Sequence, residues 1–383
     1  MTPHPSSTRT TPREDGANPA VPALSGPPPH TAVGRSGQPA LAPSWFAAVM
    51  GTGIVANAAV TLPHRVPGLR TAATVIWVVA VLLLVALTAG YVRQRALRLH
   101  AADPVQVQFF GAPAVALLTV GAGALQLGPR VIGAQAALGV GWTLWSLGTV
   151  LGCVTACTVP YLMITRHSFA SDAAFGGWLL PVVPPLVSAA TGALLVPHTP
   201  PGEPRLALLL GCCALFGLGL LAVLLVLSMF YSRLVHHAAP TGATVPTVWI
   251  GLGALSQAVT GLSLLAGAVP SVLSASYTRG AEVLALVGGV GLWGFALLWL
   301  ALASALTLRE FRAGLPFSPA WWSFIFPLGA YVTATGAVGV RSGSQLFGWA
   351  AAVLYGLLVV AWIAVAGRSL RHAAAAAGGW RRA

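Results

Sequence analysis

The stretch WWSFIFPLGAYVTATGAVG, residues 321–339, decides the fold class of this chain. It carries no charge and is long enough to cross the hydrocarbon core of a bilayer, about 30 Å, as a single helix. Pro327 and Gly329 interrupt it, although a helix that faces lipid has no reason to give up its own hydrogen bonds. Irregular backbone at membrane depth is tolerated where protein or a water-filled cavity satisfies the freed groups. The stretch therefore predicts a transmembrane helix on the inside of a bundle.

Four more hydrophobic stretches are interrupted by Pro or Gly, and the five together alternate with five that mostly are not. The other interrupted stretches are SWFAAVMGTGIVANAAV (44–60), FFGAPAVALLTVGAGAL (109–125), WLLPVVPPLVSAATGALLV (178–196) and WIGLGALSQAVTGLSLL (249–265). Their spacing is a weak repeat of roughly 70 residues, one helical hairpin per unit. Repeats of interrupted helices are typical of transport proteins. The alternation predicts an inner ring of helices around a path, wrapped by an outer ring.

Charge is confined to the segments between the hydrophobic stretches. Only 7% of residues are charged, against about 25% in soluble domains. Ten windows without a charged residue each hold about 18 or more apolar residues, enough for one span; they are 43–62, 71–92, 105–129, 131–165, 173–202, 206–232, 238–278, 283–308, 313–340 and 342–367. We expect an all-α integral membrane domain of ten transmembrane helices over residues 43–368.

The two ends of the chain differ from this body. Residues 1–42 are rich in Pro, Ser, Thr and Gly and contain no apolar core of a signal peptide, so we expect a disordered tail that is not cleaved. Residues 369–383 are expected to form a short basic tail. All 20 basic residues are Arg, and fourteen of them lie on the tails or on the same side of the predicted bundle as the tails. The positive-inside rule then places both termini in the cytoplasm of a multi-pass protein of the cell membrane. The arginines that give the net charge of +13 lie on the tails and at the ends of the predicted helices. Nucleic acid is therefore not an expected partner.

Other chemistries lack their residues. The nine His and seven acidic residues all fall in loops, tails or span ends, which disfavours a haem carrier, a proton relay and a cation filter. Cys153, Cys157, Cys212 and Cys213 lie within two spans that hold no His, Asp or Glu, so we expect buried inert thiols and no metal site. A GxGxxG at Gly289 lies inside an apolar span, where no βαβ unit forms. No cofactor and no enzymatic activity are expected.

Residues 321–329 form the most specific local pattern. Pro327 cannot donate to the carbonyl of Ser323, so the helix is expected to kink there, and Gly329 adds freedom. The kink would aim the ring of Phe326 at the interior, where an aromatic ring across a narrow apolar path blocks ions. The alternative is that Phe326 packs against protein or faces lipid.

Small and hydroxyl residues follow the interruptions; the hydroxyl residues are Thr52, Thr119, Ser188, Thr191, Ser256, Thr260, Thr333 and Thr335. Ten residues at or near the interruptions are candidates for kinking the helices or lining the path. The candidates are Thr52, Gly53, Asn57, Pro113, Pro184, Pro185, Gln257, Pro327, Gly329 and Thr335. Hydroxyls of Thr52 and Thr335 offer weak donors to an anion, and weak multi-site binding suits conduction. Asn57 and Gln257 are the strongest polar groups in these helices. Their alternative role is to hydrogen-bond a neighbouring helix.

SWFAAVMGTGI (44–54) and WWSFIFPLG (321–329) resemble the first and ninth spans of the tellurite-resistance/dicarboxylate transporter family, part of the voltage-dependent and slow anion channel superfamily. The resemblance covers residues 43–368, and its malate permease and sulfite exporter branch is the nearest in pattern. It implies five helical hairpins in quasi-fivefold arrangement around a central pore, and a homotrimer with one pore per protomer. It also implies that a Phe on the ninth span occludes the pore, a role that the motif carries onto Phe326.

Two functions remain open at this point. The first is transport of small anions, such as malate and other C4-dicarboxylates or sulfite, through a neutral pore closed by Phe326. The second is a membrane-embedded sensory or interaction protein of the same fold that conducts nothing. The sequence does not name the anion.

Overall fold

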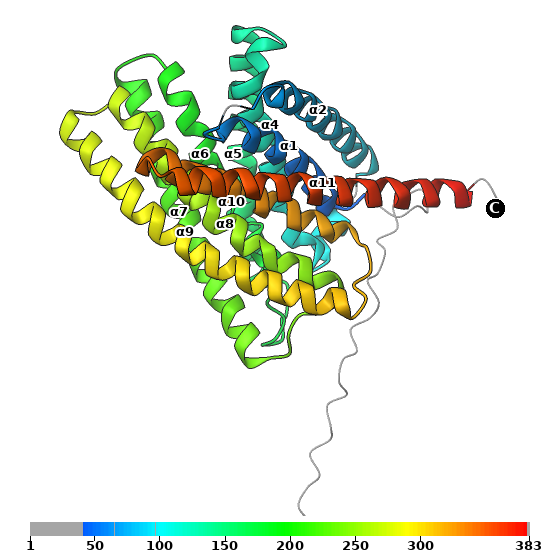
Figure 1. Cartoon of the computed structure of the whole chain (residues 1–383). Helices are drawn as coiled ribbons and strands as arrows, with labels where there is room; N and C mark the ends of the chain where they lie inside the picture. The colour runs from blue at the N-terminus through cyan, green and yellow to red at the C-terminus, as the bar shows by residue number, and fades with distance from the viewer. Residues whose placement is uncertain (1–40, 65, 96, 381–383) are drawn as a thin grey trace, which may run out of the picture.

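The computed structural model describes residues 41–64, 66–95 and 97–380. Within them every regular element is a helix and no strand occurs (Figure 1), so the predicted all-α class is confirmed. Residues 1–40, which make up nearly all of the predicted N-terminal tail, lie outside the described residues, as do 381–383.

Buried and exposed helices alternate along the chain. In the most apolar windows of four inner helices 67–89% of residues are buried, against 17–22% in the outer helices. The inner helices are α1 (Phe46–Thr61), α4 (Gly111–Leu127), α6 (Pro184–Leu195), α8 (Trp249–Ala268) and α10 (Trp322–Ser342). The outer helices are α2 (Leu69–Gln94), α5 (Ala134–Thr165), α7 (Glu203–His236), α9 (Ala275–Arg312) and α11 (Gln345–Trp380). The predicted alternation of inner and outer helices is thus confirmed.

The helices pair into five hairpins that form a closed ring. Each inner helix packs against the outer helix that follows it in the chain. Around the ring, α1 contacts α4, α4 contacts α6, α6 contacts α8, α8 contacts α10, and α10 returns to α1. The connections contain α3 (Leu97–Ala102) and the 3-10 turns η1 (Pro43–Trp45), η2 (Gln106–Phe110), η3 (Gly128–Arg130), η4 (Gly176–Leu179), η5 (Val196–His198), η6 (Gly242–Val248), η7 (Val269–Ser271) and η8 (Pro319–Trp321).

Glycines let the inner helices approach one another closely. A Cβ on Gly53 would lie 2.8 Å from Cγ2 of Thr119 in α4, and one on Gly329 would lie 2.6 Å from Cγ2 of Ile54 in α1. Small residues at helix contacts are a general feature of membrane bundles. Gly53 and Gly329, predicted as lining residues, are therefore contacts between helices.

The prolines of α4 and α6 do not break a helix in the middle, contrary to the prediction. Pro184 and Pro185 are the first two residues of α6, and Pro113 is the third residue of α4. The first N–H groups of a helix have no partner within it, so proline there removes no hydrogen bond. Pro327 is the one that lies deeper in an inner helix, and α10 continues through it to Ser342.

The fifth predicted span, 178–196, is shorter than expected. Nine helices in the described residues are long and apolar enough to cross a membrane, and α6 is not among them. Its 12 residues reach about 18 Å at 1.5 Å per residue. The chain from Leu180 to Val183 is a turn instead, because proline at 181, 184 and 185 delays the start of the helix.

The C-terminal segment is also more regular than predicted. Helix α11 continues past residue 368 to Trp380, and its end extends beyond the other helices in Figure 1. The alanines at 373–377 have the highest helix propensity of any residue, which explains the extension. The predicted tail at 369–383 is thus helical as far as the structure describes it.

The prediction that all four cysteines are buried holds fully for one of them, and Cys153 is half-buried. Cys212 is buried, but Cys157 and Cys213 are exposed on the outer helices α5 and α7. An apolar thiol on an outer helix suits a lipid-facing surface as well as a protein interior.

Candidate functional site

A cavity of about 250 Å³ lies within the ring and is lined by all five inner helices. Its wall comes mostly from the C-terminal halves of these helices. No charged residue lines it in the described part of the chain. Its polar wall residues are Asn57, Thr61, Thr119, Gln126, Thr191, Gln257, Thr260, Ser263 and Thr333. We call it the large cavity.

A second cavity of about 30 Å³ lies toward the N-terminal ends of the same helices. Its wall is almost entirely apolar and includes Met50, Phe109, Leu180 and Ile250. This space holds about one water molecule, and an apolar lining offers such a water too few partners. We call this apolar space the small cavity.

Phe326 lies between the two cavities. Among the described residues it is the one that lines both of them, and its side chain is 5% exposed. Pro327 follows it and lines the small cavity. A Cβ on Gly253 of α8 would lie 3.2 Å from Pro327, so the two helices meet closely at this level. Phe326 is thus buried inside the bundle, in contact with both cavities.

Four threonine hydroxyls in the wall use their protons inside the protein. Thr333 donates to the carbonyl of Ala330 at 2.8 Å, so its 3.1 Å contact with Thr260 must be a bond donated by Thr260. The other two donate to carbonyls one turn back, Thr61 to Ala58 at 2.9 Å and Thr119 to Val115 at 2.7 Å. These hydroxyls present lone pairs to the cavity, which an anion does not seek.

Other wall groups keep hydrogens that they can donate into the cavity. In the described part of the chain the side chains of Gln257 and Thr191 make no hydrogen bond, although both line the cavity. The Oγ of Ser263 accepts a 2.7 Å bond from Nε of Arg341, which leaves its own proton free. Asn57 donates one amide hydrogen to the carbonyl of Thr119 at 3.0 Å and keeps the second. The wall thus offers several weak donors and no fixed charge.

The structure brings only some of the predicted lining residues to the cavities. Asn57 and Gln257 line the large cavity and Pro327 lines the small one. Thr52 and Thr335 lie elsewhere, and each accepts a bond from an outer-helix indole. Trp362 Nε1 donates to Thr52 at 3.2 Å and Trp293 Nε1 donates to Thr335 at 2.9 Å. These two hydroxyls join helices, as do the glycines, and the prolines 113, 184 and 185 begin helices.

Sequence reasoning missed three polar wall residues, Thr61, Gln126 and Ser263. Each lies on the same face of its helix as a polar residue already considered. Thr61 is four residues after Asn57, Gln126 is seven after Thr119, and Ser263 is three after Thr260. Residues at these spacings share one helix face, so following the helical period from the known polar positions finds all three.

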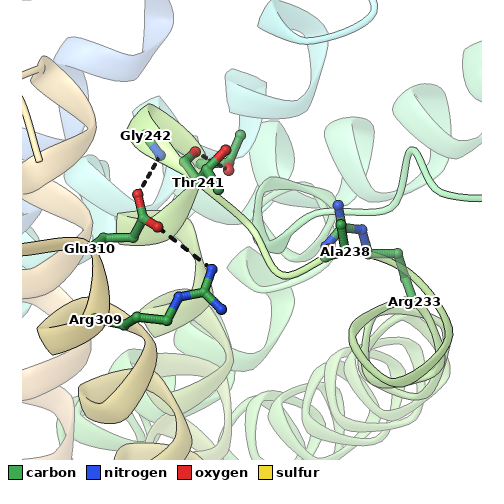
Figure 2. Close-up of polar contacts among 7 residues, drawn as sticks. Arg233, Ala238, Thr241, Gly242, Arg309 and Glu310 are labelled. Carbon is green, nitrogen blue, oxygen red and sulfur yellow. Dashed lines mark hydrogen bonds and ion pairs between the residues drawn. The ribbon is translucent and has the colours of Figure 1, made fainter. Parts of the chain in front are cut away.

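Charged side chains at the N-terminal end of the ring hold loops in place. Figure 2 shows Glu310, at the end of α9, accepting a 3.1 Å bond from the backbone N–H of Gly242 and lying 3.6 Å from Arg309. Arg233, at the end of α7, donates to the carbonyls of Ala238 at 2.6 Å and Asp172 at 3.1 Å. These contacts fix the segments that lead into α6 and α8. The small cavity is lined by Leu180 and Val183, just before α6, and by Ile250 in α8.

Comparison with known proteins agrees with this geometry. Residues 40–370 match the model of a family described as voltage-dependent anion channel. The chain is similar to the sulfite efflux pump SSU1 of Arthroderma otae, at 28% identity over 80% of this chain and 83% of that protein. An uncharacterized transporter of Methanocaldococcus jannaschii is 30% identical over 84% of this chain and 90% of its own length. The malic acid transport protein of Schizosaccharomyces pombe is 24% identical over 58% of this chain and 53% of its own length. The chain therefore belongs to the voltage-dependent anion channel family, as a multi-pass membrane protein that transports anions and is not an enzyme.

Proposed function

We propose that this chain passes small anions through the centre of its five-helix ring, and that Phe326 closes the path. The observation that carries the proposal is the position of Phe326 as the residue shared by the large and the small cavity. A ring between a polar cavity and a dry apolar one is where the passage of a hydrated ion is hardest, because the ion must shed water without finding partners. Rotation of the Phe326 side chain into the large cavity would open this point without moving a helix.

The wall chemistry supports an anion as the transported species. A cation in the large cavity would find lone pairs but no carboxylate. An anion would find the amide of Gln257 and the hydroxyls of Thr191 and Ser263, which have protons to donate. Each is a single neutral hydrogen bond, worth about 0.5–1.5 kcal/mol net, so the anion is held weakly and leaves readily. None of the described residues that line the cavity has a titratable side chain, which supports passage without proton coupling.

Sulfite is the first candidate substrate and malate the second. The match to sulfite efflux pumps extends over 80% of this chain, whereas the match to the malic acid transport protein covers 58%. A single small oxyanion needs only a few donors, as the wall supplies. A C4-dicarboxylate has two separate carboxylate groups to satisfy, and the described wall offers only these few neutral donors.

The arginine distribution supports an orientation with both termini in the cytoplasm. In this orientation the small cavity and Phe326 lie toward the cytoplasm and the large cavity opens outward. A sulfite ion leaving the cell would therefore pass the constriction first. The homotrimer implied by the family resemblance remains a prediction, which the mass of the purified particle in detergent tests.

Flux measurements on purified protein in liposomes test the function. We expect vesicles that contain the protein to release sulfite faster than empty vesicles, with malate slower and potassium no faster than in empty vesicles. Phe326→Ala serves as the opened form in case the wild-type protein is closed at rest. If both forms leave every anion as tightly retained as in empty vesicles, the protein is a non-conducting sensory or interaction protein. If malate leaves faster than sulfite, the order of the substrates is reversed.

A further inference from the structure

The large cavity opens at the C-terminal ends of the inner helices, which we call the C-terminal mouth. Consecutive inner helices are separated by one outer helix each, so all five run in the same direction. Their last carbonyl groups, which have no partner within the helix, therefore gather at one end of the ring. Together they give this end a partial negative charge. An anion that leaves the large cavity here meets repulsion unless a cation offsets it.

Arg341 lies at this mouth and contacts its wall. It is the last residue but one of α10, and Val340 before it lines the large cavity. Its Nε donates to Oγ of Ser263 at 2.7 Å, and its Nη2 also donates to the carbonyl of Ser263 in α8. The guanidinium also lies beside Gly267 of α8, where a Cβ would make an ordinary van der Waals contact with Nη2 at 3.6 Å. Arg341 is half-buried and forms no ion pair with any residue that the structure describes. Glu282 of α9 is the acidic residue that interacts with it electrostatically at longer range.

Arg70 repeats this arrangement in another sector of the ring. It lies in α2, and its Nη2 donates to the carbonyl of Gln126 at 2.7 Å. Gln126 is the last residue but one of α4, and its side chain lines the large cavity. Two arginines from different hairpins thus bind carbonyls of cavity-wall residues at the same end of the ring.

We propose that Arg341 and Ser263 form an anion-binding site at the C-terminal mouth, for small oxyanions of one or two negative charges, and that Arg70 adds a second positive charge in another sector of the same mouth. The inference rests on the proposed transport function and adds the residues that favour anions over cations. Ser263 accepts from Arg341 and turns its own proton to the anion, while the two guanidinium groups offset the carbonyl ends. An anion that moves between the neutral cavity and bulk water passes this site. Its charge raises the local anion concentration and so the rate at which anions enter.

Arg205 supplies a matched control. It lies at the same end of the bundle and also binds backbone carbonyls, those of Thr199 at 2.8 Å and Ser271 at 3.4 Å. Neither of these residues lines the large cavity. Arg205→Gln removes the same charge and the same kind of contact, but away from the mouth.

The test compares variants in the Phe326→Ala background, by sulfite flux from liposomes and by the reversal potential in a salt gradient across a planar bilayer. We expect Arg341→Gln to lower sulfite flux about tenfold, within the range of electrostatic effects on entry rates. We also expect it to shift the reversal potential toward the equilibrium potential of the cation, because selectivity for anions is reduced. Arg341→Lys should restore most of the flux, and Arg70→Gln and Ser263→Ala should lower it to a smaller degree. Arg205→Gln should match the background. The loss should shrink in high salt, because mobile ions screen these charges.

Two failures can be told apart. If Phe326→Ala conducts anions and Arg341→Gln, Arg70→Gln and Ser263→Ala all match it, the mouth site is refuted and the transport function stands. If Phe326→Ala itself conducts nothing, the proposed function fails and the mouth site falls with it. Arg70 is exposed, so its removal leaves folding intact even where the Arg341 variant folds poorly. An Arg205→Gln loss equal to that of Arg341→Gln would also refute the site, since it would show a general effect of surface charge.

Discussion

Replacing Phe326 with alanine is expected to raise sulfite flux through the protein at least about tenfold, which corresponds to a barrier lowered by about 1.4 kcal/mol. The Phe326 ring is the one described side chain that lines both cavities, of about 250 Å³ and 30 Å³. Its truncation to a methyl group joins them. A hydrophobic constriction stops ions by excluding water, so a continuous water path removes the main obstacle. Stopped-flow release of sulfite from liposomes at equal protein content measures the change.

Phe324→Ala is the control for this prediction. Phe324 lies two residues earlier on the same helix, is 8% exposed and lines neither cavity. Its ring packs edge-on against Trp249, with centroids 5.5 Å apart, and against Trp321 at 5.9 Å. Phe→Ala in a packed core typically costs about 3–5 kcal/mol, so this variant should unfold at lower temperature while its flux stays at the wild-type level. Equal leakage from both variants would mean that loosened packing, and not loss of a plug, opens the path.

The size of the side chain at 326 gives a graded version of the same test. Leucine keeps the constriction apolar but fills less of it. Phe326→Leu should therefore conduct at a rate between those of the wild-type protein and Phe326→Ala. A leucine variant as tight as the wild type together with a conducting alanine variant fits a threshold for wetting. A leucine variant that conducts more than alanine would contradict a steric and hydrophobic plug.

The sequence predicted the helices and their burial because both follow from one-dimensional patterns. Uncharged windows indicated the spans, and Pro or Gly within every second span indicated the inner ring. The Phe-Pro step drew attention to Phe326 but left open whether its ring gates a path, packs against protein or faces lipid. The family resemblance pointed to the same residue. These features depend on residues close together in the chain.

Whether a residue lines the cavity depends instead on which side chains of the neighbouring helices it contacts. Thr52 and Thr335 are hydroxyl residues on inner helices, as Thr191 and Thr260 are. They differ because indoles of α11 and α9 reach the first two from outside the ring. Trp362 is 310 positions from Thr52 in the chain, so no local pattern in the sequence links them.

The short fifth span has a similar explanation. A run of apolar residues of the right length was interpreted as a full helix, but proline at 181, 184 and 185 leaves a turn at 180–183. That turn forms part of the wall of the small cavity, which Leu180 and Val183 line. Composition shows that a segment is apolar. It does not show that the backbone of this turn packs closely against the start of α4, which only the three-dimensional structure reveals.

Gly111→Ala is expected to destabilise the protein by about 3 kcal/mol or more, at the upper end of the usual cost of overpacking. A Cβ on Gly111, the first residue of α4, would lie 1.9 Å from the carbonyl oxygen of Leu180 and 2.6 Å from its carbonyl carbon. Backbone atoms cannot rotate away as the end of a side chain can. The turn at 180–183 must therefore move as a whole, and with it the wall of the small cavity. Thermal unfolding in detergent, followed by size-exclusion elution, measures the loss.

Gly294→Ala separates this contact from the general effect of filling a glycine. Gly294 lies in the outer helix α9, and a Cβ there meets no atom within 4 Å. Alanine has the better helix propensity by about 0.8–1.0 kcal/mol, so this variant should be as stable as the wild type or slightly more. Because Leu180 and Phe109, which flank the contact, both line the small cavity, whatever Gly111→Ala protein does fold should also leak anions. A Gly111→Ala protein that is as stable and as tight as the wild type would show that the turn yields freely, and that the constriction beneath Phe326 is not held by this backbone contact.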